Sequence, residues 1–177
     1  MTQQGVLTKA ELLAELRSSR QDLLDRLGAL PEDQFEQGRY EGGWNACQIL
    51  AHVASIEWTY PRLIDVARQG APDQASGGSG GAPEGSSTPN QARAARGGIG
   101  SYNERQVEKR AQATVAELLA EFQKNRDATI EAVEQADEAL LQVHIRSAGG
   151  IPGPLARVIY FVAVVHVAGH VNDIVGS

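Results

Sequence analysis

The stretch LARVIYFVAVVHVAGHVNDI, residues 155–174, decides the fold of this chain. Pro154 directly precedes it and suits the first turn of a helix, so the sequence predicts a last helix from Leu155 to Ile174. Its longest apolar run, Val158 to Val171, is broken by His166 and His170. We expect this run to be too short and too polar to span a bilayer, and the helix to pack within a bundle.

Two earlier helices are predicted from capping signals. Thr8 opens a capping box, in which two side chains satisfy backbone N–H groups that a helix start leaves unbonded, and a leucine stripe follows until Pro31. Asn45 opens a second helix that runs to about Arg68. Pro61 either kinks this helix or ends its regular part, because proline has no N–H to donate.

The remaining helical signals complete a four-helix pattern. Ser101 opens a third helix, and a capping box at Thr114 predicts a break before a longer piece at 115–136. Residues 70–100 are rich in Gly, Ser and Pro, so we expect a flexible loop, with a lid or binding loop as the functional alternative. With no convincing alternating strand, the prediction is an all-α four-helix bundle forming one domain over residues 1–177.

Composition and charge narrow the functional classes. Hydrophobic residues make up 42% and charged residues 21% of the chain, which is typical of a globular protein. The net charge of -6 disfavours nucleic acid as a partner, because duplex binders need clustered Lys and Arg. A single cysteine, Cys47, and the lack of a charged-then-apolar leader favour a cytoplasmic protein with no membrane partner.

Two histidines in the last predicted helix are candidates for chemistry. His166 and His170 are four residues apart, so they lie on one helix face, which we expect to point inward. Burying an unsatisfied polar group costs about 1–3 kcal/mol, so each imidazole needs a hydrogen-bond partner or a cation. A shared metal ion and a pair of core or interface histidines bonded to carbonyls both satisfy this need.

A third histidine favours the metal interpretation. His52 lies in WNACQILAHVASIEW, residues 44–58, and a bundle that packs this helix against the last could bring three imidazoles together. Three neutral imidazoles suit a divalent ion: zinc or nickel, with iron or copper as alternatives. One or more coordination positions should stay open, as in catalytic sites. The segment His166–His170 lacks the Glu of the H-E-x-x-H pattern, which argues against peptide hydrolysis.

Three further residues could take part in such a site. Asp173, one turn beyond His170, could orient an imidazole or a bound water, although an exposed carboxylate at the helix end is the alternative. His144 is a spare candidate for a fourth ligand, and we expect it to be a surface histidine. Cys47 is five residues before His52, so we expect it to point elsewhere and to be buried as a small apolar residue.

Several of these segments resemble the DinB-like superfamily of four-helix bundles, which includes bacterial low-molecular-weight-thiol S-transferases. The resemblance rests on residues 44–58, on VVHVAGHVNDI at 164–174, and on YNERQVEKR and TVAELLAEF at 102–110 and 114–122. It implies helices in up, up, down, down order with a long crossover, frequent homodimers, and a metal held by His52, His166 and His170. Members often carry glycine then glutamine after the last histidine, where this chain has Asn172 and Asp173.

Two functions of different classes remain open at this point. The first is a metal-dependent thiol S-transferase, or a related enzyme, that uses a small thiol cosubstrate as the nucleophilic thiolate against small electrophiles. The reaction class comes from the resemblance. The second is a non-catalytic, stress-associated bundle in which the metal ion only links helices.

Overall fold

The computed structural model describes residues 6–40, 43–70 and 98–176. Almost all of the loop expected at 70–100 therefore lies outside the described residues. The helix that follows, α5 (Gly98–Glu108), begins three residues before the expected start at Ser101.

The predicted capping boxes are confirmed, and each one opens a helix of the bundle. Thr8 caps α1 (Lys9–Gly28), Asn45 caps α2 (Ala46–Glu57), and Thr114 caps α6 (Val115–Gln135). In each case the cap side chain accepts from the backbone N–H three residues on, and the acidic or amide side chain there accepts from the backbone N–H of the cap.

The two predicted breaks are also confirmed. Pro61 ends the regular part of the second helix, because α2 stops at Glu57 and α3 (Pro61–Arg68) begins with the proline at its first position, where no N–H is needed. The third predicted helix is two pieces, α5 and α6, separated just before Thr114. A short 3-10 helix, η1 (Glu32–Glu36), lies in the connection between α1 and α2.

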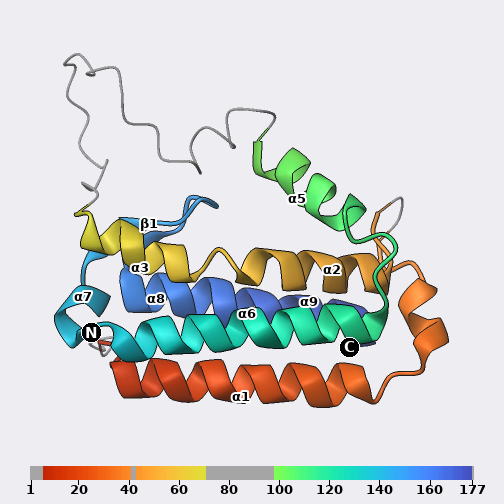
Figure 1. Ribbon diagram of the computed structural model, residues 1–177, viewed down its shortest axis with the longest axis horizontal. Coiled ribbons are helices and arrows are strands. Elements are labelled where there is room, and N and C mark those ends of the chain that lie inside the picture. Colours follow the sequence, from red (N-terminus) through yellow and green to blue (C-terminus); the bar gives the residue numbers. More distant parts are fainter. Residues whose placement is uncertain (1–5, 41–42, 71–97, 177) are drawn as a thin grey trace, which may run out of the picture.

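Contacts between helices fix the direction of α1 and α2 relative to α6. On α1, Arg17 pairs with Glu134 of α6. Farther along α1, Arg20 pairs with Asp127, an earlier residue of α6, so these helices are antiparallel. On α2, the Ala54 carbonyl accepts from Asn125, and the later Glu57 accepts from Thr129 (3.2 Å). Thus α2 and α6 are parallel (Figure 1).

The last helix runs antiparallel to α2. The Tyr60 hydroxyl, just after α2, donates to the Val162 carbonyl (2.8 Å), whereas the earlier His52 lies against the later His170. The all-α bundle with one long crossover is confirmed, but the order of directions is up, down, down, up rather than up, up, down, down. The physical reason is that the order depends on which distant side chains pack together, and these contacts make α2 and α6 parallel.

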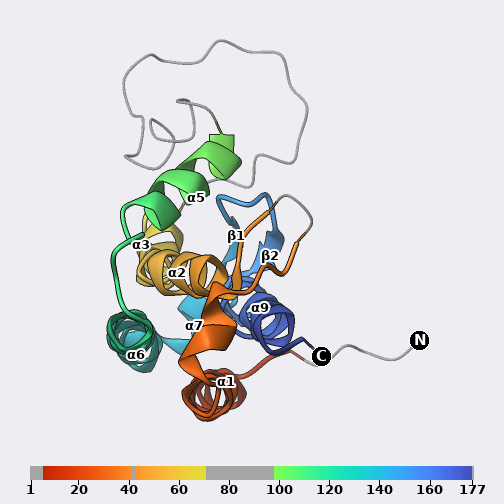
Figure 2. The same ribbon diagram turned by 90° about the vertical axis from the view of Figure 1, so that its right-hand side faces the viewer.

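The last helix contains a π-helical turn that its sequence does not predict. It consists of α8 (Leu155–Tyr160), a π-helical turn, η2 (Phe161–Val165), and α9 (His166–Val175), in direct succession. Figure 2 looks along the bundle and shows α1, α6, α2 and α9 around a common core, with α5 outside against α2.

Two short strands correct the expectation that no strand forms. A four-residue helix, α7 (Glu138–Leu141), leads to β1 (His144–Arg146), which pairs antiparallel with β2 (Pro152–Pro154). Three residues per strand are too few to show an alternating pattern, so the sequence could not reveal this hairpin. Pro154 lies at the end of β2 and caps α8.

The last helix ends at Val175, one residue beyond the predicted Ile174, and it is more apolar than expected. Residues 155–175 form a continuous helix of 21 residues with a window of mean hydropathy 1.6, so by length and composition alone it could cross a membrane. This corrects the view that the segment is too short and too polar. Helices that form the core of a bundle pass the same test.

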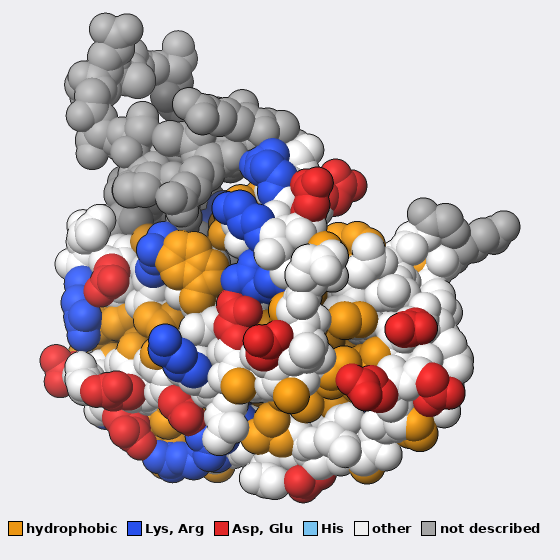
Figure 3. Space-filling model, turned by 45° about the vertical axis from the view of Figure 1, so that its right-hand side comes forward, with side chains coloured by type: hydrophobic (Ala, Val, Ile, Leu, Met, Phe, Trp, Pro, Cys, Tyr) orange, Lys and Arg blue, Asp and Glu red, His pale blue; other side chains and the backbone are white. Residues whose placement is uncertain are grey.

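On the face of the molecule drawn in Figure 3, Lys and Arg side chains lie beside Asp and Glu side chains.

A buried ion pair ties the bundle together at its centre. The Arg126 side chain on α6 has 0% exposure, as does that of Glu57 on α2. Arg126 Nε and Nη2 donate to the two carboxylate oxygens of Glu57 at 2.6 and 2.9 Å. The remaining donors of Arg126 reach the Leu16 carbonyl, the Ser19 hydroxyl and the Ala163 carbonyl. All five guanidinium N–H groups are therefore satisfied, and the last helix, α1, α2 and α6 share one network.

Replacing Arg126 with Met should lower the free energy of unfolding by about 3–5 kcal/mol, because Glu57 would lose its buried partner. Urea denaturation followed by circular dichroism measures this change. The matched control is Arg17→Met, which breaks an exposed pair with Glu134 and should change stability by no more than about 1 kcal/mol. Equal effects in the two variants would contradict the role of the buried pair.

Candidate metal centre

The structure brings the three predicted histidines together. His52 extends from α2, and His166 and His170 from α9, where antiparallel packing of the two helices places their side chains side by side. One ring nitrogen of each histidine lies within 4.8 Å of one nitrogen of the other two. Among the described residues, no other His, Cys, Asp or Glu belongs to this group.

The spacing of the ring nitrogens is that of a ligand set. His166 Nε2 and His170 Nε2 are 3.1 Å apart. Two nitrogens bound to one tetrahedral zinc ion, each about 2.0–2.1 Å from it, are separated by roughly 3.3 Å. The three rings pack edge to face, with centroids 4.5 to 6.0 Å apart.

The group lies at the edge of the core and opens toward solvent on one side. His52 is only 4% exposed, the His170 side chain is 17% exposed, and His166 is exposed. Thus the innermost ligand candidate comes from α2 and the outermost from the first residue of α9. A molecule approaching from solvent would meet the His166 side of the group first.

Burial keeps all three imidazoles in their neutral, ligand-competent form. It lowers the pKa of His52 to about 3, with smaller contributions from the neighbouring His170 and His166. Burial also lowers the pKa of His166. The pKa of His170 is lowered mainly by burial and then by His166, against the opposing effect of Asp173. At neutral pH each ring therefore offers a lone pair and no positive charge repels a cation.

Two ring nitrogens of the group form no hydrogen bond, which is compatible with residues that could hold a divalent metal ion. The Nδ1 atoms of His52 and His170 are buried and form no hydrogen bond. Core histidines normally satisfy such atoms with carbonyls, which was the alternative to a metal site. No carbonyl bonds these two Nδ1 atoms, although the Asp173 carboxylate lies 3.5 Å from that of His170, whereas the third ring, His166, does bond a backbone carbonyl, that of Val162.

Outer contacts orient the rings of the group. Asp173 Oδ2 lies 3.5 Å from His170 Nδ1, close enough to orient the ring without completing a hydrogen bond. The same oxygen accepts from the Tyr40 hydroxyl (2.5 Å), and burial together with Asp173 raises the pKa of Tyr40 to about 12. The Trp44 ring packs against His52, with centroids 5.2 Å apart.

The other sequence candidates lie outside the group. His144 is exposed on β1, as expected for a surface histidine, although it lies in a strand rather than a turn. Cys47 is half-buried, and burial raises the pKa of its thiol, so it is held as the weakly reactive thiol. Sequence reasoning missed Tyr40, because a single tyrosine 133 residues from Asp173 carries no pattern.

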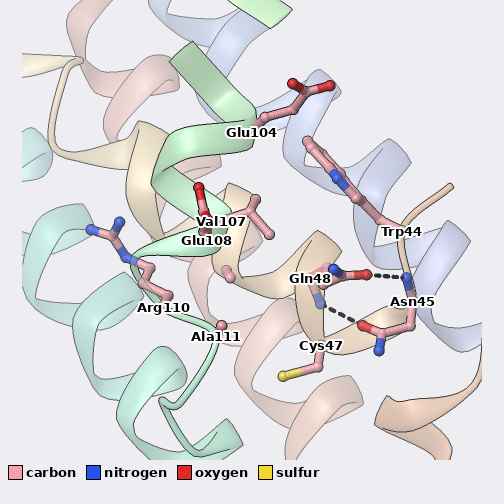
Figure 4. Close-up of a pocket in the computed structure, with 10 residues that line it drawn as sticks. Trp44, Asn45, Cys47, Gln48, Glu104, Val107, Glu108, Arg110 and Ala111 are labelled. Carbon is pink, nitrogen blue, oxygen red and sulfur yellow. Dashed lines mark hydrogen bonds between the residues drawn. The ribbon is translucent and has the colours of Figure 1, made fainter. Parts of the chain in front are cut away.

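A cavity of about 350 Å³ lies between α2 and α5, and none of the three histidines lines it. Figure 4 shows Trp44, Cys47 and Gln48 on one side and Glu104, Glu108 and Arg110 on the other. Trp44 belongs to both places, since its ring contacts His52 and lines the cavity. The guanidinium of Arg110 is bonded to Glu121, and two carboxylates of α5, Glu104 and Glu108, also belong to the described lining of the cavity.

Comparison with known proteins assigns the family. Residues 15–174 match the family model for the DinB superfamily. This chain belongs to the DinB superfamily. The match covers α2, α6 and the last helix, and it includes all three histidines. No curated protein matches this DinB-superfamily chain in sequence.

Solved structures share the fold. A mycothiol-dependent maleylpyruvate isomerase aligns over 95% of this chain and 61% of its own, with a TM-score of 0.68 and 16% identity. A histidine-to-alanine mutant of that isomerase has the same coverage and TM-score, with 15% identity. An uncharacterised protein from Escherichia coli UTI89 aligns over 96% of this chain and 94% of its own, with a TM-score of 0.62 and 16% identity. This chain thus spans less than two thirds of the isomerase.

The metal-free protein should lose stability as the pH falls from about 6.5 toward 3. In this range the unfolded chain protonates His52, whereas the folded state, with its pKa near 3, does not. Urea midpoints at pH 7 and pH 5 measure the loss, with His52→Leu as the variant that lacks this linkage and His144→Leu as the control that retains it. Parallel pH profiles for the wild type and His52→Leu would contradict the assignment.

Proposed function

We propose that this DinB-superfamily protein binds a divalent metal ion, zinc or nickel first and iron or copper as alternatives, through His52, His166 and His170. We further propose that it is a thiol S-transferase or related enzyme acting on small electrophiles. The observation that carries the proposal is the convergence of three neutral imidazoles, two of them with buried nitrogens that no protein group satisfies.

The composition of the group favours catalysis over a purely structural metal. Structural zinc sites are closed by four protein ligands, whereas the described residues supply three. A divalent ion with neutral ligands keeps its full charge and lowers the pKa of a thiol or water bound to it. The exposed side of the group at His166 leaves a route by which a small thiol could arrive.

The structural neighbour supports the thiol class of cosubstrate. The isomerase that shares the fold depends on mycothiol, a small thiol. At 16% identity and 61% coverage of that enzyme, the likeness establishes the fold, and the cosubstrate class of this chain remains our proposal. The thiol must come from outside, because Cys47, the chain's single cysteine, lies apart from the histidines and keeps a raised pKa.

The chain's own residues have clear tasks in this proposal. Trp44 packs against the ring of His52 and also lines the cavity between α2 and α5, where the non-reacting part of a cosubstrate could lie. Asp173, held by Tyr40, limits rotation of the His170 ring.

Three expectations from the sequence remain predictions alongside this function. They are a cytoplasmic location, a homodimer, and the lack of nucleic-acid or membrane partners.

Replacing His166 or His170 with Ala should abolish stoichiometric metal binding, because two remaining imidazoles hold such ions weakly. Metal content after dialysis against a weak chelator, measured by mass spectrometry, tests this. His144→Ala removes an exposed histidine outside the group and should bind metal as the wild type does. Full occupancy in either triad variant would disprove the ligand assignment.

With cobalt at the site, addition of 2-mercaptoethanol or L-cysteine should produce a sulfur-to-metal charge-transfer band. Binding should also release about one proton per site, since metal-bound thiols are held as thiolates. Absorption spectroscopy and titration in weak buffer measure the two effects, with ethylene glycol as the control for 2-mercaptoethanol. The His52→Ala variant should show neither signal. A fully metallated wild type that ignores these thiols would favour the non-catalytic metal-binding bundle.

A further inference from the structure

The π-helical turn of the last helix ends at a proposed metal ligand. The backbone N–H of His166 donates to the Phe161 carbonyl, five residues back, rather than to the Val162 carbonyl, four residues back, as a regular α-helix would require. The Val162 carbonyl is thereby released from its usual bond with the His166 amide. Such turns cost hydrogen-bond geometry and are frequent at functional sites.

Two buried side chains, Tyr60 from the α2–α3 break and Arg126 from α6, donate hydrogen bonds to carbonyls of the π-helical turn. The Tyr60 hydroxyl donates to the Val162 carbonyl at 2.8 Å, and Arg126 Nη2 donates to the adjacent Ala163 carbonyl. Tyr60 is 5% exposed, and burial raises its pKa well above the usual range, so its hydroxyl remains a protonated donor. The break between α2 and α3 places Tyr60 just ahead of Pro61, beside the last helix.

The released carbonyl also meets the imidazole of His166. The ring forms a hydrogen bond with the Val162 carbonyl, while its Nε2 faces His170 Nε2. Nδ1 is therefore the atom at the carbonyl. Because a carbonyl can only accept, Nδ1 must carry the proton and Nε2 must keep its lone pair, directed at the other two histidines.

We propose that Tyr60 is a positioning residue for the histidine group: by holding the Val162 carbonyl in the π-helical turn, it fixes the ring orientation and tautomer of His166. The proposal rests on the metal site argued above. The α2–α3 break and the π-helical turn have a part in the same role. The break places the Tyr60 hydroxyl, and the turn places the Val162 carbonyl, where both meet beside the His166 ring. A backbone carbonyl that receives the second ring N–H of a ligand histidine is a common outer contact of metal sites.

The test compares Tyr60→Phe with Thr129→Val. Tyr60→Phe removes the hydroxyl and keeps the packed ring, whereas Thr129→Val removes a hydroxyl that bonds Glu57 and Asn125 in the same buried region without touching the turn. Zinc affinity, measured by competition with a chromophoric chelator, should fall about 10- to 100-fold in Tyr60→Phe. It should be unchanged in Thr129→Val, which controls for a general loss of stability.

A second measurement needs no metal. Nitrogen-15 NMR of the metal-free wild type should show His166 as a single tautomer protonated at Nδ1, and Tyr60→Phe should show a mixture of tautomers. Wild-type affinity and a wild-type tautomer in Tyr60→Phe would overturn the inference. If the wild type itself binds no zinc, the proposed metal site fails, while the tautomer of His166 still decides whether Tyr60 positions the ring.

Discussion

One guanidinium, that of Arg126, connects the helices on which the histidine group depends. Its five donors end on Glu57, on Leu16 and Ser19 of α1, and on the Ala163 carbonyl of the last helix. Taking two charges out of water costs several kcal/mol per ion, and the network offsets this through complete hydrogen bonding and close pairing. A change in the position of any of these helices would leave a buried charge or donor unsatisfied, so the arrangement is held to one geometry.

This network lies within one or two helical turns of the histidines on both helices that carry them. Glu57 is five residues beyond His52 on α2, and Ala163 is three residues before His166. The same interaction that joins α2 to the last helix therefore fixes the distance between the inner and outer ligand candidates. The bundle contains two groups of buried polar side chains. In the Arg126 network every guanidinium N–H has an acceptor, whereas in the histidine group the Nδ1 atoms of His52 and His170 form no hydrogen bond. The histidine group is the one suited to a ligand.

The π-helical turn links the two groups. Its carbonyls accept hydrogen bonds from Arg126 and from Tyr60 of the α2–α3 break, and its last amide belongs to His166. The turn thus connects the buried pair to His166, the most exposed histidine of the group. Access from solvent and a fixed ring orientation, which normally oppose each other, are combined at this position.

The sequence alone determined the features that depend on near neighbours. Capping boxes at Thr8, Asn45 and Thr114 act within a few residues, so their helix starts could be predicted, and so could the break at Pro61. His166 and His170 could be named from their helical spacing, and His52 from its place in a helix expected to pack against theirs. The resemblance to the DinB-like superfamily is confirmed by the match to its family model.

Only the tertiary structure decided what depends on distant partners. The up, down, down, up order follows from contacts between helices, which spacing within one helix cannot reveal. Arg126 and Glu57 are 69 residues apart, and each by itself resembles a solvated surface charge. The π-helical turn and the partners of Val162 and Asp173 have no sequence pattern. Every residue has a backbone carbonyl, so the identity of Val162 does not predict a partner. The Tyr60 and Tyr40 hydroxyls reach their acceptors only when distant segments pack together.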